Sequence, residues 1–428
     1  MKRLLRDNLL VRNTFWMMGG NGVRVFLQAI YFLLIARALG AREYGAFIGT
    51  VSLVALVVPF SSWGTGFLLI KETTRDRGQF ARYWGTALSM TAFSGCVLLG
   101  GILLVARAVW GISVPLGIVL LVGISDAIMV RIVDLANQAF MAVEVLRKSA
   151  QLYVVLSAAR TLAAVYLSFA VHNATAESWA LLYLLSALAA ATYGVVEVTR
   201  ALGLPTLGVH ISRPELKEGF YFSVCQSSQT IYNDIDKTML VRFGGLEATG
   251  IYGAAYRIVD VCFAPVGSLV AAAYPRFFRH GENGIAGSIG FAKKLLPYSA
   301  AYGLLAAILL AVASPLLPLL LGEGFATATI ALQWLSPLIF IKSIHYFLAD
   351  SLSGAGHQGP RTAVQLGVVG INVLLNLWLI PIYSWRGAAW ASIASDGALA
   401  VGLFATIAVL KRKSMPETIL GADSSVML

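Results

Sequence analysis

The chain has 428 residues, of which 58% are hydrophobic and only 12% are charged, whereas soluble proteins carry about 45–50% apolar and about 25% charged residues. A soluble fold cannot bury so much apolar surface, so the composition excludes a cytosolic enzyme, a disordered chain and a small disulfide scaffold. The formal net charge of +11 is typical of a membrane protein with basic cytoplasmic loops, and we expect no nucleic acid as a partner.

Twelve apolar segments are each long enough to cross a lipid bilayer as a helix, which takes about 20 residues. No polar linker between them could hold a soluble domain, so we expect an all-α integral membrane protein. Arg24 interrupts the first apolar run and no cleavage site follows it, so we predict an uncleaved span rather than a signal peptide. In chain order, the predicted spans are residues 12–36, 44–70, 83–107, 115–143, 150–171, 176–198, 219–241, 249–273, 295–320, 326–350, 362–383 and 386–410.

The basic residues between these spans are distributed asymmetrically. Lys and Arg number 21 in the loops of one side and 5 in the loops of the other. Because cytoplasmic loops carry the excess of basic residues, this asymmetry predicts an even number of spans with both termini in the cytoplasm. The other six cations fall inside predicted spans: Arg24, Arg131, Arg160, Lys237, Arg257 and Lys342.

A short motif of Arg, two Gly and an aromatic residue occurs after the first span and again after the seventh. The two copies are Arg37, Gly40, Gly45 and Phe47, and Arg242, Gly245, Gly250 and Tyr252, which lie 205 residues apart. Six spans separate the copies, so both halves have the same orientation. We therefore expect a parallel repeat of two six-helix bundles, residues 1–205 and 206–428, around a central cavity used for alternating access. The alternative is a chance match, since the motif is short.

Charged side chains inside the membrane must be hydrated or paired, because one Arg, Lys or Asp at mid-membrane costs about 2.5–3.5 kcal/mol on insertion scales. An excess of buried cations indicates a cavity for an anionic substrate, and the planar guanidinium of Arg is well suited to phosphate. Arg24 has no acidic neighbour one turn away in its own helix. It is therefore the best single candidate for a cation that faces this cavity, together with Gln28 on the same face.

For the other intramembrane charges, pairing is an open alternative to substrate binding. Asp260 lies three residues after Arg257, and Asp126 and Asp134 bracket Arg131, so each Arg has acidic neighbours in its own helix. Arg160 and Lys342 have none. The remaining acids, Asp350 and Asp396, are either titrating groups or partners of these cations, and His345 is expected to be structural.

The seventh span carries a polar stripe, which indicates that one face of this helix contacts water or protein. Contacts between helices within the bundle are the alternative explanation, and Asp234 and Lys237, three residues apart, would then neutralise each other. The stripe comprises Ser223, Gln226, Gln229, Thr230, Asn233, Asp234, Asp236 and Lys237.

Motifs for catalysis are absent from the sequence, which contains no GxxxxGK[ST], HExxH or GxSxG pattern. The three cysteines form no CxxC pair or metal-binding spacing. We therefore expect neither an enzyme nor a bound cofactor or metal.

Four stretches resemble the polysaccharide repeat-unit flippases, called Wzx-type, of the multidrug/oligosaccharidyl-lipid/polysaccharide exporter superfamily. In that family the last stretch reads LIPxYGxxGAA, and here Ser384 replaces the Gly. The stretches are Asn13 and Trp16 with LLIARALGAREYGAF at 33–47, DIDKTMLVRFGGLEATGIYGAAYRI at 234–258, LSGAGHQGPRTAV at 352–364 and NVLLNLWLIPIYSWRGAAWASIAS at 372–395.

The resemblance implies a flippase that moves an oligosaccharide linked to undecaprenyl pyrophosphate from the cytoplasmic to the periplasmic leaflet of the bacterial inner membrane. It also implies coupling to an ion gradient, of H⁺ or Na⁺, and association with glycan polymerase and chain-length proteins. Arg24 and Arg257 are the first candidates to bind the pyrophosphate. The further candidates are the cations Lys237, Arg160, Arg131 and Lys342, the polar residues Gln28, Gln226, Gln229, Asn233 and Asp236, and, for coupling, Asp126, Asp134 and Asp260.

Three other functions are alternatives to a flippase. A drug or cation antiporter of the same superfamily would favour an acidic cavity, whereas the first span carries Arg24 and no acid. A glycan polymerase or ligase would carry a large periplasmic loop, and none of the predicted loops is long enough. The third alternative is a scramblase or a non-transporting member of a glycan-assembly complex, and the sequence does not exclude it.

Overall fold

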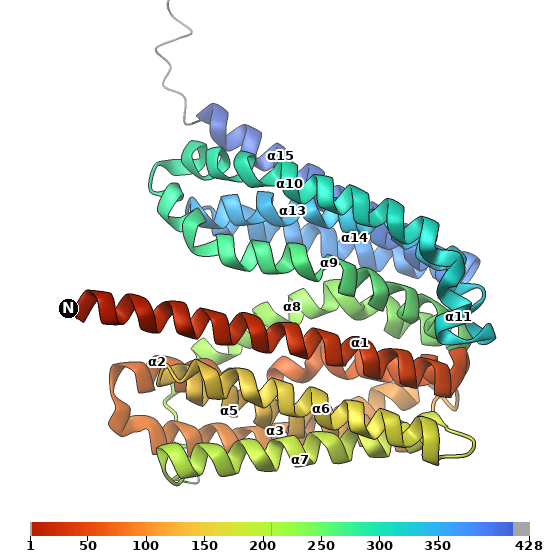
Figure 1. Ribbon diagram of the computed structural model, residues 1–428, viewed down its shortest axis with the longest axis horizontal. Coiled ribbons are helices and arrows are strands. Elements are labelled where there is room, and N and C mark those ends of the chain that lie inside the picture. Colours follow the sequence, from red (N-terminus) through yellow and green to blue (C-terminus); the bar gives the residue numbers. More distant parts are fainter. Residues whose placement is uncertain (1, 207, 414–428) are drawn as a thin grey trace, which may run out of the picture. The chain divides into compact units, whose positions relative to one another are not determined.

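The computed structural model describes residues 2–206 and 208–413, with side chains from residue 19 onward except at 225 and 413. Asn13 and Trp16 therefore lie outside the described side chains. All regular elements in these residues are helical (Figure 1). The α-helices are α1 Lys2–Val57, α2 Thr65–Arg75, α3 Phe80–Trp110, α4 Leu116–Ile124, α5 Val130–Ala142, α6 Leu146–Ala170, α7 Ala176–Leu202, α8 Arg213–Phe243, α9 Leu246–Gly281, α10 Gly284–Ala313, α11 Leu317–Leu321, α12 Ala328–Leu335, α13 Pro337–Gly354, α14 Gln358–Tyr383 and α15 Trp385–Lys413.

Nine helical segments of the described residues are long and apolar enough to cross a membrane, which confirms the expected all-α membrane fold. The number of twelve stays a prediction. Residues 19–60 count as one segment although they cover parts of two predicted spans, and neither α8 nor the 18-residue α13 is among the nine. The nine segments are Gly19–Phe60, Arg77–Trp110, Leu116–Ala142, Leu146–Ala170, Ala176–Leu202, Leu246–Gly281, Gly284–Leu321, Gln358–Tyr383 and Trp385–Arg412.

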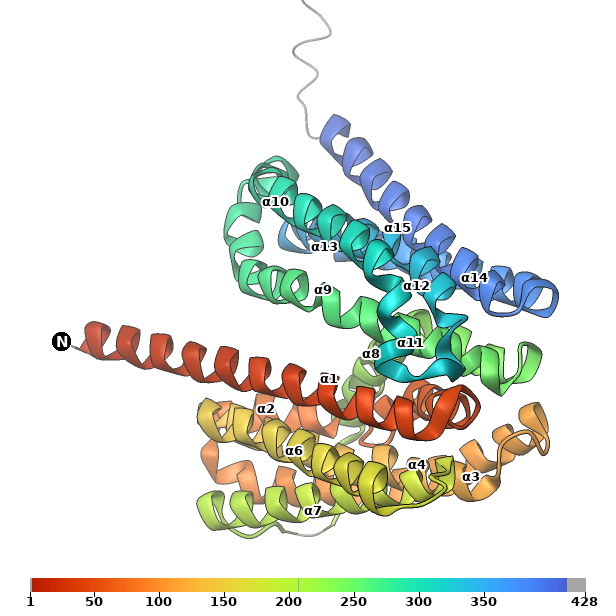
Figure 2. The same cartoon turned by 45° about the vertical axis from the view of Figure 1, so that its right-hand side comes forward.

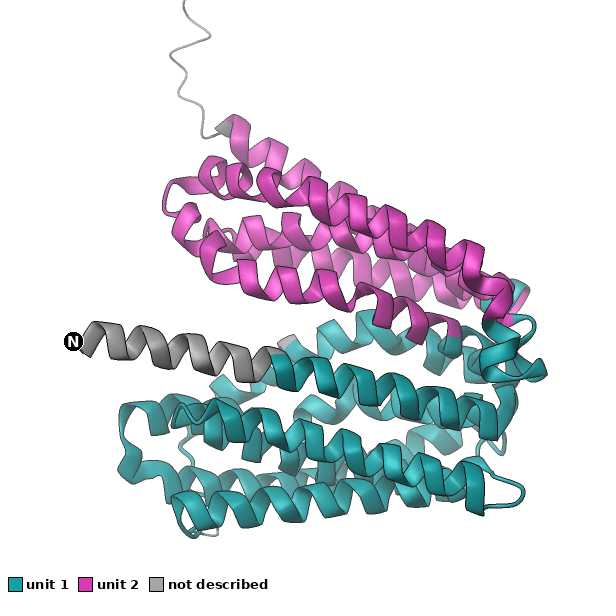
Figure 3. Cartoon of the chain, viewed as in Figure 1, with its two compact units in different colours: residues 1–254, 317–327, 383–385 teal, residues 255–316, 328–382, 386–428 magenta. Residues whose placement is uncertain are grey.

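By packing, the chain forms two compact units (Figure 3). Unit 1 comprises residues 1–254, 317–327 and 383–385, and unit 2 comprises residues 255–316, 328–382 and 386–428. The expected boundary between repeat halves, after residue 205, lies in the segment between α7 and α8. That boundary stays a prediction. The two packing units are defined by contacts within the structure, whereas the repeat halves are defined by similarity between two parts of the sequence, so the two divisions need not coincide.

In unit 1, α6 runs alongside α1 (Figures 1 and 2). A small residue allows the close approach, since a Cβ added to Gly20 of α1 would lie 2.8 Å from the Cβ of Ala150 in α6. Further along the same contact, the Thr161 hydroxyl lies 3.2 Å from the carbonyl oxygen of Leu27. Small residues and hydroxyl contacts of this kind are typical of helix packing in membranes, where lipid replaces water and the hydrophobic effect no longer brings helices together.

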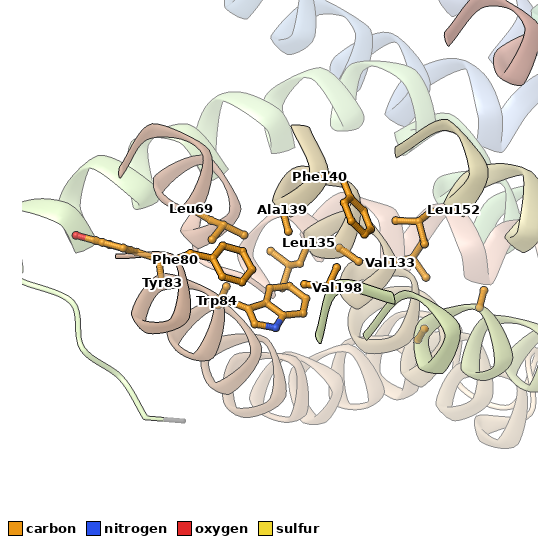
Figure 4. Packing of buried hydrophobic residues seen from close by; sticks show 14 of the residues in the cluster. Leu69, Phe80, Tyr83, Trp84, Val133, Leu135, Ala139, Phe140, Leu152 and Val198 are labelled. Atoms are coloured by element: carbon orange, nitrogen blue, oxygen red, sulfur yellow. The ribbon is translucent and has the colours of Figure 1, made fainter. Parts of the chain in front are cut away.

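The core of unit 1 lies between α2, α3, α5, α6 and α7 (Figure 4). Trp84 of α3 is fully buried and stacks on Phe80, with the ring centroids 6.2 Å apart. Leu135 and Phe140 of α5 and Val198 of α7 belong to the same cluster. This packing holds α5, which carries two of the intramembrane charges, against its neighbours.

The two copies of the glycine motif lie against each other within unit 1. Gly40 and Gly245 both adopt left-handed backbone conformations, with φ of 70° and 88°, which are favourable for glycine. A Cβ on Gly45 would overlap the carbonyl oxygen of Leu246, and a Cβ on Gly250 would overlap that of Ala41. The second glycine of each copy therefore packs against the backbone just after the first glycine of the other copy.

The segment between α7 and α8 is bound to the start of α3. Thr206 N donates to the carbonyl oxygen of Ala81 at 2.9 Å. Ser212 and Glu215 form a capping box at the start of α8, and Tyr83 of α3 also donates to the Glu215 carboxylate. Burial raises the pKa of Glu215, but the hydrogen bonds from Ser212 and Tyr83 outweigh burial and leave this pKa below its ordinary value.

In unit 2, α10 packs along α13 (Figure 2). A Cβ on Gly303 of α10 would lie 3.1 Å from the Cα of Phe340, so only a very small residue fits there. Hydroxyl groups of α10 also join the two helices: Ser288 donates to the carbonyl oxygen of Ser351 at 2.9 Å, and Ser299 donates to that of Ser343 at 3.1 Å. These contacts fix the position of α13, which carries Lys342 and His345.

Candidate functional site

A buried ion pair in unit 1 joins Asp126 and Arg160, which lie on different helical segments. Asp126 lies in a π-helical turn between α4 and α5, Ser125–Met129, and its Oδ1 is 3.3 Å from the guanidinium of Arg160 in α6. Only 15% and 11% of these two side chains are exposed. Tyr183 of α7 donates to Asp126 Oδ2 at 3.2 Å, and its ring centroid lies 3.9 Å from the Arg160 guanidinium. Removal of one partner would leave an uncompensated charge.

Arg131 forms a second ion pair, with Asp134 of the same helix at 3.2 Å. Its guanidinium also donates twice to the Ser62 hydroxyl, at 3.0 and 2.9 Å. The predicted pairing of Arg131 with its two neighbouring carboxylates is thus confirmed for Asp134 and wrong for Asp126, which pairs with Arg160. The sequence missed the Asp126 partner because Arg160 lies on another helix, 34 residues along the chain.

Arg24 differs from these paired cations. Its guanidinium lies 4.5 Å from the ring centroid of Tyr153 in α6, and the Tyr153 hydroxyl donates to Asp134 at 2.8 Å. Among the described side chains, no carboxylate lies within ion-pair distance of Arg24, and its side chain is half-buried. Arg24 thus brings a positive charge that its described surroundings do not neutralise.

The polar stripe of α8 contains an internal charge pair. Lys237 is 5% exposed and lies 2.8 Å from Asp234 and 3.7 Å from Asp236. It also donates to the carbonyl oxygen of Asn233 at 2.8 Å, and the Tyr252 hydroxyl of α9 donates to Asp236. The expectation that Lys237 and Asp234 neutralise each other is therefore confirmed.

The polar residues predicted to line a cavity differ in exposure. Gln226 is exposed, whereas Gln28, Gln229 and Asn233 are half-buried. Their role in lining a passage stays a prediction.

In unit 2, Lys342 of α13 finds its partners on α9. Its ammonium group donates to the Tyr256 hydroxyl at 2.8 Å and lies 3.9 Å from Asp260. Asp260 is 45% exposed in its side chain, whereas Lys342 is 7% exposed. Arg257 is half-buried on the same helix.

Unit 2 also contains two pairs that the sequence did not predict. His345 of α13 lies 3.3 Å from Asp396 of α15, and Asp350 lies 3.4 Å from Arg361 of α14. The sequence offered only isolated polar residues in apolar segments, since the partners are on different helices.

The long apolar helices of this chain, joined by buried ion pairs, are those of a multi-pass membrane protein. The fold of the chain is that of MOP-superfamily transporters. The structure is similar to an inward-facing multidrug resistance MATE family transporter of that superfamily, with a TM-score of 0.73 and 14% identity over 91% of this chain and 96% of that one. It also resembles the outward-facing conformation of such a transporter, with a TM-score of 0.62 and 15% identity over 95% and 97% of the two chains. A MOP superfamily transporter from Pyrococcus furiosus matches with a TM-score of 0.62 and 14% identity over 94% and 96%.

The chain belongs to the polysaccharide biosynthesis protein family, whose sequence profile matches residues 10–280. This membership confirms the resemblance described from the sequence. A protein of Escherichia coli (strain K12), provisionally described as an O-antigen transporter, is 25% identical over 197 residues. That match covers 46% of this chain and 48% of the relative, so the chain spans about half the length of the relative it matches.

Proposed function

We propose that the protein is a flippase, which moves an undecaprenyl-pyrophosphate-linked oligosaccharide repeat unit from the cytoplasmic to the periplasmic leaflet by alternating access. Membership of the polysaccharide biosynthesis family and the transporter fold support this proposal. Translocation makes and breaks no covalent bond, so we propose no enzymatic activity and no cofactor. The driving force would be a gradient of H⁺ or Na⁺, for which Asp126, Asp134 and Asp260 are candidate coupling residues.

The single observation that favours an anionic substrate is the environment of Arg24. A cation paired with a carboxylate presents little net charge to a ligand, whereas Arg24 faces an aromatic ring and no described carboxylate. Its planar guanidinium can donate two parallel hydrogen bonds to a phosphate. We therefore propose Arg24 as the first contact of the pyrophosphate. Arg257 and the partnered cations Arg131, Arg160, Lys237 and Lys342 remain predictions for this role.

We further propose that the protein lies in the bacterial inner membrane with both termini in the cytoplasm, as the 21 basic residues on one side predict. Glycan polymerase and chain-length proteins are the proposed partners, since they would act on the exported unit.

The first test is mass spectrometry of lipid extracts from cells depleted of the protein. The proposal predicts that a complete lipid-linked repeat unit accumulates and that surface glycan is lost, and a leaflet-accessibility assay then separates flipping from polymerisation. Sensitivity to cationic drugs without any accumulation would instead support a drug antiporter.

The second test substitutes Arg24 in the export assay. Loss of a charge-assisted hydrogen bond costs about 1.5–3 kcal/mol, so Arg24→Ala should lower export about ten- to a hundred-fold. Arg24→Lys should fail in part if two parallel hydrogen bonds matter, and should function if charge alone suffices. The matched control is Arg107→Ala, because Arg107 is an exposed cation of α3. Unchanged export by folded Arg24→Ala protein would show that Arg24 does not bind the substrate.

A further inference from the structure

A histidine–carboxylate pair is buried in unit 2. His345 Nε2 of α13 lies 3.3 Å from Asp396 Oδ1 of α15, and only 5% and 3% of the two side chains are exposed. The pair lies beside hydrogen-bonded polar groups: Asn376 donates to Asn372 at 3.1 Å, and Asn372 donates to Ser395, the neighbour of Asp396, at 3.0 Å. Ionisable groups at such positions in membrane helices are expensive, and they mark proton and ion pathways by default.

This pair differs in chemistry from the candidate coupling carboxylates. Asp126 and Asp134 are held by Arg160 and Arg131, and a guanidinium keeps its proton throughout the physiological pH range. In these two pairs only the carboxylate can therefore accept or release a proton. Histidine, by contrast, is the side chain that titrates between about pH 5 and 8. An imidazole nitrogen can accept and release a proton, so both partners of the His345–Asp396 pair have an atom that can hold one, whereas only the carboxylate does in the arginine pairs.

The charged and titratable groups around the pair come from four helices. The Tyr346 ring stacks on His345 with the centroids 4.9 Å apart, and Tyr346 is within electrostatic reach of Lys342, Asp260, Asp350 and Asp396. From α10, the neutral Ser299 hydroxyl donates to the carbonyl oxygen of Ser343, two residues before His345 in α13. The surrounding groups are Lys342, Tyr346 and Asp350 of α13, Tyr256 and Asp260 of α9, Arg361 of α14 and Asp396 of α15.

We propose that His345 and Asp396 form the proton-coupling site of this protein, so that the coupling ion is H⁺. The inference rests on the proposed transport function. A proton from one side of the membrane binds to His345 Nε2, which changes the charge of the pair from −1 to 0. The imidazolium and the carboxylate then attract each other, which favours close packing of α13 against α15. Release of the same proton to the other side restores the charge of −1 and weakens that contact.

The competing explanation is that the pair only stabilises unit 2. A buried ion pair is weak support for stability, because desolvation offsets most of the attraction. A structural role predicts that substitution lowers the unfolding temperature and leaves the proton dependence of transport unchanged. The coupling role predicts that proton dependence is lost in protein that is still folded.

The experiment uses the full-length protein in lipid vesicles with lipid-linked oligosaccharide extracted from the depleted cells. Translocation is measured with and without an imposed pH gradient, and an internal pH-sensitive dye records proton movement. We expect the gradient to accelerate translocation by the wild type, and His345→Gln and Asp396→Asn to abolish both the acceleration and the substrate-dependent proton signal. His280→Gln is the matched control, since His280 is an exposed histidine of α9 stacked on Phe291.

One further variant and two kinds of outcome separate the possible failures. Asp396→Glu keeps the carboxylate and should keep the proton signal. This variant therefore still tests the role of the carboxylate if Asp396→Asn does not fold. The inference would be overturned if a pH gradient accelerated translocation by His345→Gln as much as by the wild type, or if translocation responded to a Na⁺ gradient in place of the pH gradient. Neither result would contradict the proposed transport function. If the wild type moves no lipid-linked oligosaccharide across the vesicle membrane, the transport function itself fails, and the inference with it.

Discussion

The reciprocal contact between the two glycine motifs can be tested by adding single methyl groups. A Cβ on Gly45 would overlap the Leu246 carbonyl oxygen and lie 2.8 Å from Gly250 N, and a Cβ on Gly250 would lie 2.8 Å from the Ala41 carbonyl carbon. These neighbours are backbone atoms within helices, so no rotation of a side chain can relieve the overlap. Gly45→Ala and Gly250→Ala must each push the two segments apart.

The expected cost follows from two opposing terms. Overpacking by an added methyl group costs about 1–3 kcal/mol, and a backbone contact belongs at the upper end of that range. The higher helix propensity of Ala returns about 1 kcal/mol. Each variant should therefore lose about 2 kcal/mol of unfolding free energy. The double variant should lose less than the sum, because one separation of the segments relieves both overlaps.

The assay is thermal unfolding of the purified protein in detergent, in which each single variant should unfold several degrees below the wild type. Gly100→Ala is the matched control, since a Cβ on Gly100 of α3 meets no atom within 4 Å and should leave the unfolding temperature unchanged or slightly higher. Equal unfolding temperatures for Gly45→Ala and Gly100→Ala would refute the close contact between the motif copies, and with it the structural reason for the repeated glycines.

Three further predictions concern polar contacts of unit 1. Asp126→Asn should leave the Arg160 charge buried and cost about 3–5 kcal/mol in thermal unfolding, and the double variant with Arg160→Gln should recover part of this loss. Tyr153→Phe keeps the ring next to Arg24 and should preserve export, whereas Tyr153→Leu removes a cation–π contact worth about 0.5–2 kcal/mol and should lower export several-fold. Because the folded-state pKa of Glu215 is depressed, its stabilisation is present above the ordinary glutamate pKa and is lost as the pH falls through the folded pKa; the unfolding temperature of Glu215→Gln should lack this component of the acid dependence.

Features that depend on local spacing could be predicted from the sequence. The Lys237–Asp234 pair is three residues apart on one helix, so helical periodicity alone brings the two charges together. The glycines of the repeated motif also have a local origin, since Gly40 and Gly245 adopt a backbone conformation that other residues avoid. Composition and segment length were sufficient for the all-α membrane fold.

Pairs formed between helices could not be predicted in this way. Arg160 lies 34 residues from Asp126, and His345 and Asp396 lie on α13 and α15 with α14 between them in the chain. The local sequence pattern of one apolar helix does not predict which polar residue of another helix its own polar residues will contact. The number of interior charges could therefore be predicted from the sequence, whereas the structure was needed to show which of them are neutralised.

This distinction changes the argument for an anionic substrate. An excess of interior cations in the sequence indicates an anionic substrate, yet within unit 1 the cations Arg131, Arg160 and Lys237 each lie within 4 Å of a carboxylate. Two opposite charges at that distance produce only a weak field at a ligand several ångströms away. Attraction of the proposed pyrophosphate by this unit would therefore depend on Arg24 far more than a count of cations suggests. For that reason a single substitution at Arg24 is a sharper test of the substrate's charge than a series of substitutions at the paired cations, which would also disturb the folded state.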